Sequence, residues 1–526
     1  MHDAQFILAI DLGTSGCKVA LVSTQGEIVA TENEALAVSL LPNGGAEQDP
    51  DAWWTAIKRA TRRILERQLT PIAAIVAVCC TAQWSGTVPV DSNGNHVRNA
   101  IIWLDARGAP YVRKVTSGPI KLEGYGVDKL WTWIQKTGGI PTRSGKDSIA
   151  HILYLKHAEP DVYQQAAFFL EPKYYINLRL TGKCAASTES ITLHWVTDNR
   201  NINQIAYDDQ LLKLATLDRA KLPDLRAAVD LLGPLKPAVA EELGLAPTTQ
   251  VVMGTPDIHS AAIGSGAVQD YAAHLCIGTS GWLACHVPFK KSDLFHNMAA
   301  LPSALPGRYL LLNEQEVAGG CLAFLKQQIL YPSDELPQEA LPPDIFQMFE
   351  QSVAQTPAGS GNVIFTPWLN GERTPVEDHT VRGGFHNLSL QTTRAHLIRA
   401  VYEGVALNSR WLLGYVEQFI KRPLTAIRMI GGGAQSEVWC QIHADVLGRP
   451  IQQVREPLHA NARGAALLAA VALGHLTVDE IPAKAPIQKT FEPNPQHAAL
   501  YAKLFREFVN LYKSNRRIHA RLNGHK

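Results

Sequence analysis

The chain has 526 residues and a mass of 57.5 kDa, enough for two to four domains at the usual size of roughly 150 residues. Its formal net charge is +1 and its pI is about 7.7, which argues against a nucleic-acid-binding protein, because such domains are usually strongly basic. Hydrophobic residues make up 46% of the chain and charged residues 18%. A chain of this length and composition can bury a large core and is not disordered.

The N-terminal segment lacks the basic region of a signal peptide, and the apolar stretch that follows is interrupted by Asp11. No uncharged apolar run reaches the roughly 18 residues of a membrane span. The eight cysteines are scattered, without a C-x-x-C pair or a dense His/Cys cluster, so neither a zinc site nor a disulfide framework is predicted. The sequence therefore predicts a cytoplasmic protein with reduced cysteines and with no membrane or nucleic-acid partner. A homodimer is left open.

The first predicted elements form a hairpin around a glycine-rich turn. Residues 6–12 are an apolar run typical of a buried strand, and residues 18–23 alternate as a second strand. A turn at Gln25–Gly26 leads into a third strand over 27–32. The glycine-rich segment Gly13–Gly16 therefore joins two strands, whereas a dinucleotide-binding glycine motif would open a helix.

The tetrapeptide Gly-Thr-Ser-Gly of this turn recurs at Gly278–Gly281, about half a chain later. Both copies follow an apolar run and precede an alternating segment, which predicts duplicated halves. The small residues of such hairpins let backbone N–H groups bind phosphate. Asp11 is a suitable ligand for Mg²⁺ and Lys18 a suitable partner for a phosphate, or Asp11 caps the turn and Lys18 is solvated. A Walker loop is absent: the string Ser144–Asp147 lacks the upstream glycine.

A third glycine-rich segment follows later in the C-terminal half. Ile427–Ile430 is predicted as a strand, Gly431–Gly433 as a tight turn, and Gln435–Leu447 as a helix with Ser436 near its N-cap and Gly448 just past its end. A helix N-terminus beside three glycines allows the close approach of a flat nucleoside. A plain strand–helix connector has the same local pattern.

Three further helices are predicted toward the C-terminus. In Leu397–Ile420, Arg399 and Glu403 lie four residues apart and are interpreted as a helix ion pair rather than as catalytic groups. A second helix covers Asn461–Leu473, with Asn461 as its N-cap and a glycine as its stop. The tail beyond about residue 490 is predicted as a helix whose basic face is solvated rather than a partner site.

Taken together, the motifs resemble the FGGY carbohydrate kinases, and within that family the xylulose kinases most closely. The resemblance extends from residue 6 to about residue 475, with the blocks in the family's order. The blocks are Asp11–Gly16, Glu47–Pro50 with Trp53-Trp54, Trp103–Arg107, Pro172–Tyr175 with Arg179–Gly182, Gly254–Gly264, Gly278–Gly281, Asn370–Pro375 with Arg399–Gly404, and Gly431–Ser436 with Trp439 and Asp445.

The resemblance implies an α/β fold of two duplicated ribonuclease-H-like domains, as in the actin-like ATPases, with a cleft between them. The first domain (1–266) would bind the sugar and carry the first phosphate hairpin, and the second (267–526) would bind the nucleotide. The implied enzyme is a phosphotransferase that moves the γ-phosphate of Mg-ATP to a hydroxyl of a xylulose-like ketose, with Asp257 as general base. The alternatives are a kinase for another polyol or sugar acid (ribulose, glycerol, erythritol or gluconate), or a degenerate, non-catalytic member of the family.

The same resemblance implies the site residues. His259 either supports Asp257 or packs in the core. The acceptor site would contain Gln, Trp and Asp side chains, which suit hydroxyls and the C–H faces of a sugar. Its expected residues are Gln83, Trp84, Ser85, Trp103, Asp105 and Asp257. The residues expected to hold ATP and Mg²⁺ are Asp11 (also the metal ligand), Gly13, Thr14, Ser15, Lys18, Gly278, Thr279, Gly432, Gly433, Gln435 and Ser436.

The chain departs from the xylulose kinases at three places. Trp84-Ser85 replaces a Met-His pair, residues 187–192 only loosely match the family's pattern, and Arg463 replaces a leucine. An indole adds a flat apolar wall, and the loss of an imidazole removes a polar contact, which should relax or redirect selectivity. D-xylulose is therefore expected to be a poor substrate beside at least one other ketose or polyol.

Overall fold

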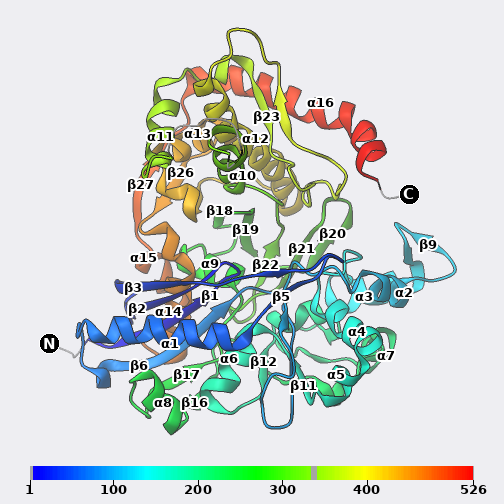
Figure 1. Cartoon of the computed structure of the whole chain (residues 1–526), viewed down its shortest axis with the longest axis vertical. Helices are drawn as coiled ribbons and strands as arrows, with labels where there is room; N and C mark the ends of the chain where they lie inside the picture. Colours follow the sequence, from blue (N-terminus) through cyan, green and yellow to red (C-terminus); the bar gives the residue numbers. More distant parts are fainter. Residues whose placement is uncertain (1–3, 333, 335–340, 525–526) are drawn as a thin grey trace.

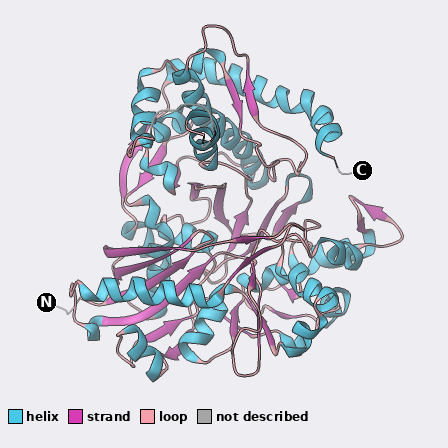
Figure 2. Ribbon diagram, viewed as in Figure 1, coloured by secondary structure: helices cyan, strands magenta, loops and turns pink. Residues whose placement is uncertain are grey.

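The computed structural model describes residues 4–332, 334 and 341–524. Each half of the described chain contains one large sheet, the N-terminal one in the lower part of Figure 1 and the C-terminal one above it. Helices pack against the sheets of both halves (Figure 2). The eight cysteines, all within the described residues, form no disulfide, and all but Cys184 are buried. No helix in the described ranges is both long and apolar enough to cross a bilayer.

The N-terminal sheet has the strand order β16-β17-β6-β1-β2-β3. The inner neighbours β17, β6 and β1 run parallel, and β16, β2 and β3 each run antiparallel to the neighbour nearer the centre. Its strands are β1 (Phe6–Leu12), β2 (Gly16–Ser23), β3 (Ile28–Ala35), β6 (Ile75–Ala82), β16 (Leu231–Pro234) and β17 (Gln250–Val252).

The C-terminal sheet repeats this arrangement in β27-β26-β25-β18-β19-β22, with the same parallel and antiparallel pairings, and adds β21 and β20 at its edge. The predicted duplication is thus confirmed strand by strand. Its strands are β18 (Ala273–Ile277), β19 (Gly281–Val287), β20 (Lys291–Asp293), β21 (Met298–Pro302), β22 (Tyr309–Leu312), β25 (Ile427–Ile430), β26 (Ile451–Val454) and β27 (Ile487–Phe491).

The N-terminal sheet is covered on both faces because its strands are apolar on both faces. In β2, Val19 and Leu21 pack in one core cluster with residues of α1 and α6, and Ala20 and Val22 pack in another with residues of α14. The alternation over 18–23 therefore separates two buried faces rather than a buried and a solvated one. The covering helices are α1 (Pro50–Glu66), α6 (Pro172–Thr181) and α14 (Ala460–Ala472).

Helix α14 belongs to the second half of the chain and also crosses α9 (Asp257–Gly264) of the first half at very short range. A Cβ on Gly264 would lie 1.7 Å from the backbone O of Ala460, and one on Gly464 would lie 1.9 Å from that of Ser260. Only glycine allows this backbone-to-backbone contact. The crossing fixes α9, which begins with Asp257, against the other half of the molecule.

The remaining elements build the connecting regions. One small sheet has β5 (Ala46–Gln48) between β4 (Ser39–Leu40) and β8 (Ala100–Ile101). The two-stranded ladders pair β7 (Val88–Val90) with β11 (Phe168–Leu170), β9 (Lys121–Leu122) with β10 (Tyr125–Gly126), β12 (Ala185–Ser187) with β15 (Asp224–Arg226), β13 (Thr197–Asp198) with β14 (Ala206–Tyr207), and β23 (Ile364–Thr366) with β24 (Gly384–His386). The helices are α2 (Ala109–Thr116), α3 (Val127–Thr137), α4 (Ser148–Ala158), α5 (Pro160–Gln165), α7 (Asp209–Ala215), α8 (Pro237–Leu243), α10 (Gly320–Phe324), α11 (Ile345–Gln355), α12 (Arg394–Ile420), α13 (Glu437–Leu447), α15 (Ile481–Lys484) and α16 (Ala498–Asn523).

Most of the helix predictions in the C-terminal half are confirmed. Ser436 caps α13 by accepting a hydrogen bond from the N–H of Trp439, and Gly448 ends the helix with a left-handed φ of 64°. The Arg399–Glu403 pair is buried within α12, with 2.7 Å between Nε and Oε1. The N-cap assigned to Asn461 is wrong, because a 3-10 turn precedes α14 and the cap position falls at residue 459.

Candidate active site

A cavity of about 1770 Å³ is lined by residues of both halves of the chain. Both glycine-rich hairpins, the first turn of α9 and the segment around the glycine triplet contribute to its wall. The sequence-predicted residues that line it are Thr14, Ser15, Lys18, Gln83, Trp84, Ser85, Trp103, Asp257, Gly278, Thr279, Gly432, Gly433, Gln435 and Ser436. The described lining does not include Asp11, Gly13 or Asp105.

Asp257 is the first residue of α9 and lies partly buried at the cavity wall. Its Oδ1 accepts a hydrogen bond from the N–H of Ile258 at 2.8 Å. Burial, with the negative charge of Asp11 as the second cause, raises the pKa of Asp257 to about 7. A carboxyl with this pKa can accept a proton near neutral pH, as a general base must.

Asp11 and Lys18 face each other across the first hairpin. They are cross-strand partners of β1 and β2, and Lys18 Nζ lies 3.3 Å from Asp11 Oδ2. The aspartate is 3% exposed, whereas Lys18 reaches the cavity wall. Asp11 raises the pKa of Lys18, so the lysine stays protonated and carries a positive charge to the cavity.

The first hairpin is joined to the predicted acceptor residues by hydrogen bonds. Trp103 Nε1 donates to Thr14 Oγ1 at 2.9 Å, and Thr14 Oγ1 donates to Gln83 Oε1 at 3.2 Å. Gln48, from the Glu47–Pro50 block, donates to the backbone O of Thr14 at 2.7 Å and accepts from Gln83 Nε2 at 2.7 Å. This closed network fixes Gln83 and Trp103 relative to the first hairpin.

The residues at the Met-His position both have protein partners. Trp84 donates its indole N–H to the backbone O of Ser190 at 2.9 Å and meets His259 edge to face, with ring centroids 5.3 Å apart. Ser85 has a φ of 67° and donates its hydroxyl to the backbone O of Lys146 at 2.7 Å. Trp84 therefore offers the cavity an apolar ring, and Ser85 offers at most an acceptor oxygen.

Asp105 does not reach the cavity, contrary to its assignment as an acceptor-binding residue. It is 1% exposed, and its Oδ2 accepts from the backbone N–H of Ala46 at 2.9 Å and lies 2.7 Å from Arg107 Nη2. The carboxylate instead holds the chain after β8 against β5. The family block Trp103–Arg107 thus contains two cavity residues, Trp103 and Leu104, and one internal ion pair.

The second hairpin contributes backbone and hydroxyl groups. The N–H groups of Gly319 and Ala318, which precede α10, donate to the carbonyls of Gly278 and Thr279 at 2.7 and 2.8 Å. Gly431 packs on the same hairpin: its φ is 87°, and a Cβ there would lie 2.7 Å from the backbone O of Ile277. The glycine triplet and the hairpin are therefore in contact at one end of the cavity.

Eleven Asp, Glu, Lys and Arg residues of the described cavity wall were not identified as site residues from the sequence, and four of them form one cluster of charges. Lys146 lies in the Walker-like string Ser144–Asp147, which lacks the upstream glycine, and Arg373 lies in the Asn370–Pro375 block. Glu314 and Glu316 follow β22, where no motif marks them. Arg373 forms ion pairs with both glutamates, at 3.6 Å to Glu316 Oε2. Arg373 could have been predicted from the sequence, because it is a basic residue within a block that resembles the family.

A buried polar network lies behind Asp257. Lys173 Nζ donates to the backbone O of Gly254 at 2.8 Å and to Ser187 Oγ at 2.7 Å. Glu189 Oε1 accepts from Ser187 at 2.7 Å and from Thr255 Oγ1 at 2.8 Å. These contacts hold the chain that enters α9. They place Ser187 and Glu189, from the loosely matching segment 187–192, in a supporting role.

His259 packs beneath Trp84 and does not contact Asp257 by a hydrogen bond among the described residues. It is 1% exposed, and burial holds its pKa well below the ordinary value, so the ring is neutral. Arg463 does not belong to the described cavity lining. It pairs with Glu456 at 2.7 Å and lies 3.4 Å from the backbone O of Gly26 in the β2–β3 turn.

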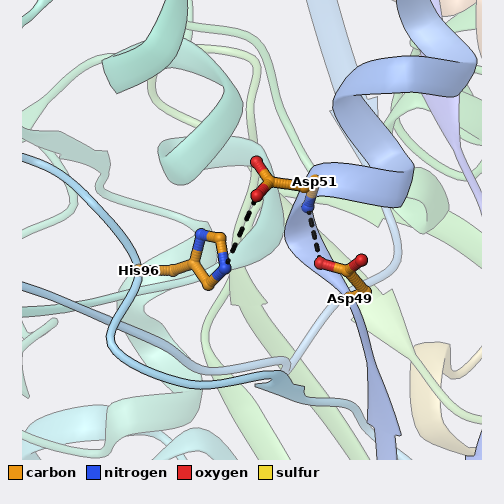
Figure 3. Close-up of side chains that lie close together, drawn as sticks. All are labelled: Asp49, Asp51 and His96. Atoms are coloured by element: carbon orange, nitrogen blue, oxygen red, sulfur yellow. Dashed lines mark hydrogen bonds and ion pairs between the residues drawn. The ribbon is translucent and has the colours of Figure 1, made fainter.

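Figure 3 shows an exposed group, Asp49, Asp51 and His96, whose potential ligand atoms lie within 4.8 Å of one another. Asp49 caps α1 by accepting from the N–H of Asp51 at 2.9 Å. Asp51 forms an ion pair with Arg179 at 3.0 Å, and His96 Nδ1 lies 3.1 Å from the hydroxyl of Tyr175. These partners account for the group, and we assign no metal to it.

Comparison with known proteins identifies the family. The family model for the N-terminal domain of the FGGY family of carbohydrate kinases matches residues 6–264, and that for the C-terminal domain matches residues 273–473. The chain belongs to the FGGY family of carbohydrate kinases. It is therefore a sugar kinase, an enzyme that transfers a phosphoryl group to an alcohol acceptor.

The similarity covers nearly all of the chain. The xylulose kinase of Escherichia coli (strain K12) is 30% identical over 96% of this chain and 98% of its own length. Among solved structures, a gluconate kinase and a ligand-bound xylulose kinase, both from Lactobacillus acidophilus, are each 26% identical with a TM-score of 0.84. They cover 99% and 98% of this chain, and all of their own chains are covered. The actin-like ATPase fold implied by the motifs is confirmed.

Proposed function

We propose that this kinase phosphorylates a neutral ketose or polyol, a xylulose-like pentulose among them, with Asp257 as general base. The observation that carries the proposal is the position of Asp257, at the wall of a cavity shared by both phosphate hairpins and by Gln83 and Trp103. With a pKa near 7, its carboxylate can take the proton of a hydroxyl as that oxygen attacks phosphorus.

The nucleotide and its metal fit the residues that are present. The Gly278–Gly281 hairpin and the glycine triplet offer unhindered backbone for phosphates and a nucleoside. Asp11 offers the hard carboxylate oxygens that Mg²⁺ prefers, and its ion pair with Lys18 is loose, at 3.3 Å. Bound Mg²⁺ would neutralise charge on the phosphates. Lys18 would supply a second positive charge to them.

The charge around the cavity supports a neutral acceptor. The described residues of the cavity wall include eight Asp or Glu side chains and five Lys or Arg side chains. Arg373 is occupied by the two carboxylates of Glu314 and Glu316. A sugar acid would therefore bring a carboxylate into a region with excess negative charge, where repulsion and desolvation oppose binding.

Steady-state assays on a panel of acceptors, which contains neutral ketoses and polyols together with gluconate, test this proposal. We expect the highest kcat/KM with a neutral ketose or polyol, a lower value with gluconate, and D-xylulose below at least one other neutral acceptor because of Trp84 and Ser85. The matched variant Trp84→Met/Ser85→His should raise relative activity on D-xylulose. A wild-type preference for D-xylulose of more than about tenfold, roughly 1.4 kcal/mol, contradicts the argument from Trp84 and Ser85. A preference for gluconate contradicts the proposal of a neutral acceptor.

The division of the chain into domains 1–266 and 267–526 is likewise part of the proposal, with acceptor recognition assigned mainly to the first and nucleotide recognition to the second. The cytoplasmic location and a homodimer stay predictions.

A further inference from the structure

Lys146 is a charged residue of the cavity wall to which the proposed function gives no role. It precedes α4 in the N-terminal half, its side chain is 19% exposed, and it lines the cavity. Its ammonium makes no hydrogen bond to a described residue: the carboxylate that it faces, Oε1 of Glu316 in the other half, is 3.8 Å away, beyond hydrogen-bond reach. Burial lowers its pKa, which reflects the cost of leaving this charge without close partners.

The surroundings of Lys146 are the predicted acceptor residues. Its Nζ lies 6.0 Å from the ring centroid of Trp103, and its backbone O accepts the hydroxyl of Ser85. Trp103 is in turn bonded to Thr14 of the first phosphate hairpin. Lys146 is therefore not a Walker lysine, and it lies where the acceptor, rather than the nucleotide, is expected to bind.

We propose that Lys146 is a specificity-determining residue for the acceptor, whose ammonium donates hydrogen bonds to acceptor oxygen atoms. This rests on the proposed function only in that a sugar or polyol enters beside Trp103. Three N–H donors on a partly buried ammonium are costly without partners, and the oxygens of a polyhydroxylated acceptor would satisfy them.

Glu316 adjusts which acceptor this ammonium favours. Its carboxylate accepts from Asn370 Nδ2 at 2.9 Å and lies 3.6 Å from Arg373 Nε, so it is held in place by groups other than Lys146. A fixed counter-charge at 3.8 Å partly neutralises the ammonium. Lys146 then acts as a donor to hydroxyl or carbonyl oxygens rather than as a site for a carboxylate.

The test compares Lys146→Met and Lys146→Gln with wild type on the acceptor that wild type uses best. Because Ser85 contacts the backbone of Lys146, both variants keep that hydrogen bond. We expect the KM for the acceptor to rise by at least about tenfold in Lys146→Met, as for the loss of a charge-assisted hydrogen bond, and by less in Lys146→Gln, which retains two donors. The KM for ATP should stay within about twofold.

The control is Lys129→Met, which removes a partly buried lysine of the same half that donates to the backbone O of Val115 and lies outside the cavity lining. It should leave both KM values unchanged. An acceptor KM in Lys146→Met within about threefold of wild type, or an equal rise in the KM for ATP, overturns the proposal. If Lys146→Met does not fold, the same criteria are applied to the KM values of Lys146→Gln.

Glu316→Gln tests the counter-charge. Without the carboxylate, the ratio of kcat/KM for gluconate to that for the best neutral acceptor should rise, and an unchanged ratio would contradict the role given to Glu316. The proposed function is tested separately, by the kcat/KM values of the wild-type enzyme on the different acceptors. If wild type prefers gluconate, the proposed function fails, and the Lys146 variants are then judged on gluconate by the same criteria.

Discussion

The two glycine-rich hairpins carry the same tetrapeptide but close differently. In the first, Leu12 pairs with Cys17, so that four residues lie in the turn. In the second, Ile277 pairs with Gly281, so that three residues lie in the turn. Identical residues thus form different turns because the strands on either side are paired in a different register. The tetrapeptide predicts a glycine-rich hairpin without determining its geometry.

The hairpins also differ in charge. The first places Asp11 opposite Lys18, and the residues at the corresponding sequence positions of the second are Cys276 and Leu283. The first is bonded through Thr14 to the proposed acceptor residues Gln83 and Trp103, whereas the second contacts the glycine triplet. The duplication has therefore produced a charged hairpin on the side where chemistry is proposed and an uncharged one that is proposed to bind the nucleotide.

The largest expected difference is between Asp11→Asn and Cys276→Ser. Asp11→Asn removes the carboxylate proposed for Mg²⁺ and leaves Lys18 without its partner, so kcat should fall by about 10²-fold or more, as for the loss of a key electrostatic group. Cys276→Ser changes a small buried side chain and should retain kcat within about threefold. Steady-state assays at saturating ATP and acceptor measure both. Equal losses would remove the distinction between the hairpins.

A second contrast concerns backbone packing. Gly431→Ala would strain a residue with φ of 87° and press a Cβ to 2.7 Å from the backbone O of Ile277, which should lower the free energy of unfolding by about 1–3 kcal/mol and raise the KM for ATP. Gly13→Ala meets its nearest heavy atom at 3.2 Å and lacks a positive φ. Its effect on stability should be smaller. Chemical denaturation of the two variants measures the order, and the reverse order contradicts the argument.

The smallest expected effect is on the pH profile. Below its pKa of about 7, Asp257 is protonated and cannot accept a proton, so kcat/KM should fall with decreasing pH and level off above about pH 7. Since Asp11 contributes to the raised pKa, Asp11→Asn should move this limb to lower pH, and Cys276→Ser should leave it in place. A limb that does not move in Asp11→Asn would show that the two carboxylates do not interact.

Local pattern was sufficient for elements whose stability is local or whose faces are uniformly apolar. The strands over 6–12 and 427–430 and the Ser436 cap agree with the structure residue by residue. The cap assigned to Asn461 failed because a 3-10 turn ahead of α14 moves the start of the helix. Such a turn depends on tertiary contacts that the sequence does not reveal.

The site shows the same limit. Asp257 could be recognised from the sequence because its block is a family motif. The direction in which a side chain points could not be predicted in this way. Asp105 turns inward to Arg107, and Lys146, which matches no motif, reaches the cavity. Glu314 and Glu316 become site residues only because β22 ends at the cleft. Each of these outcomes is determined by packing between segments that are distant in sequence.

The most direct test of the account is Asp257→Asn, assayed for both turnover and ATP binding. An amide cannot accept the proton, whereas the groups proposed to bind ATP lie on the two hairpins and the glycine triplet. The account predicts a loss in kcat of at least about 10²-fold with the dissociation constant for ATP nearly unchanged. Retention of more than about a tenth of wild-type turnover would contradict the role of Asp257 as general base.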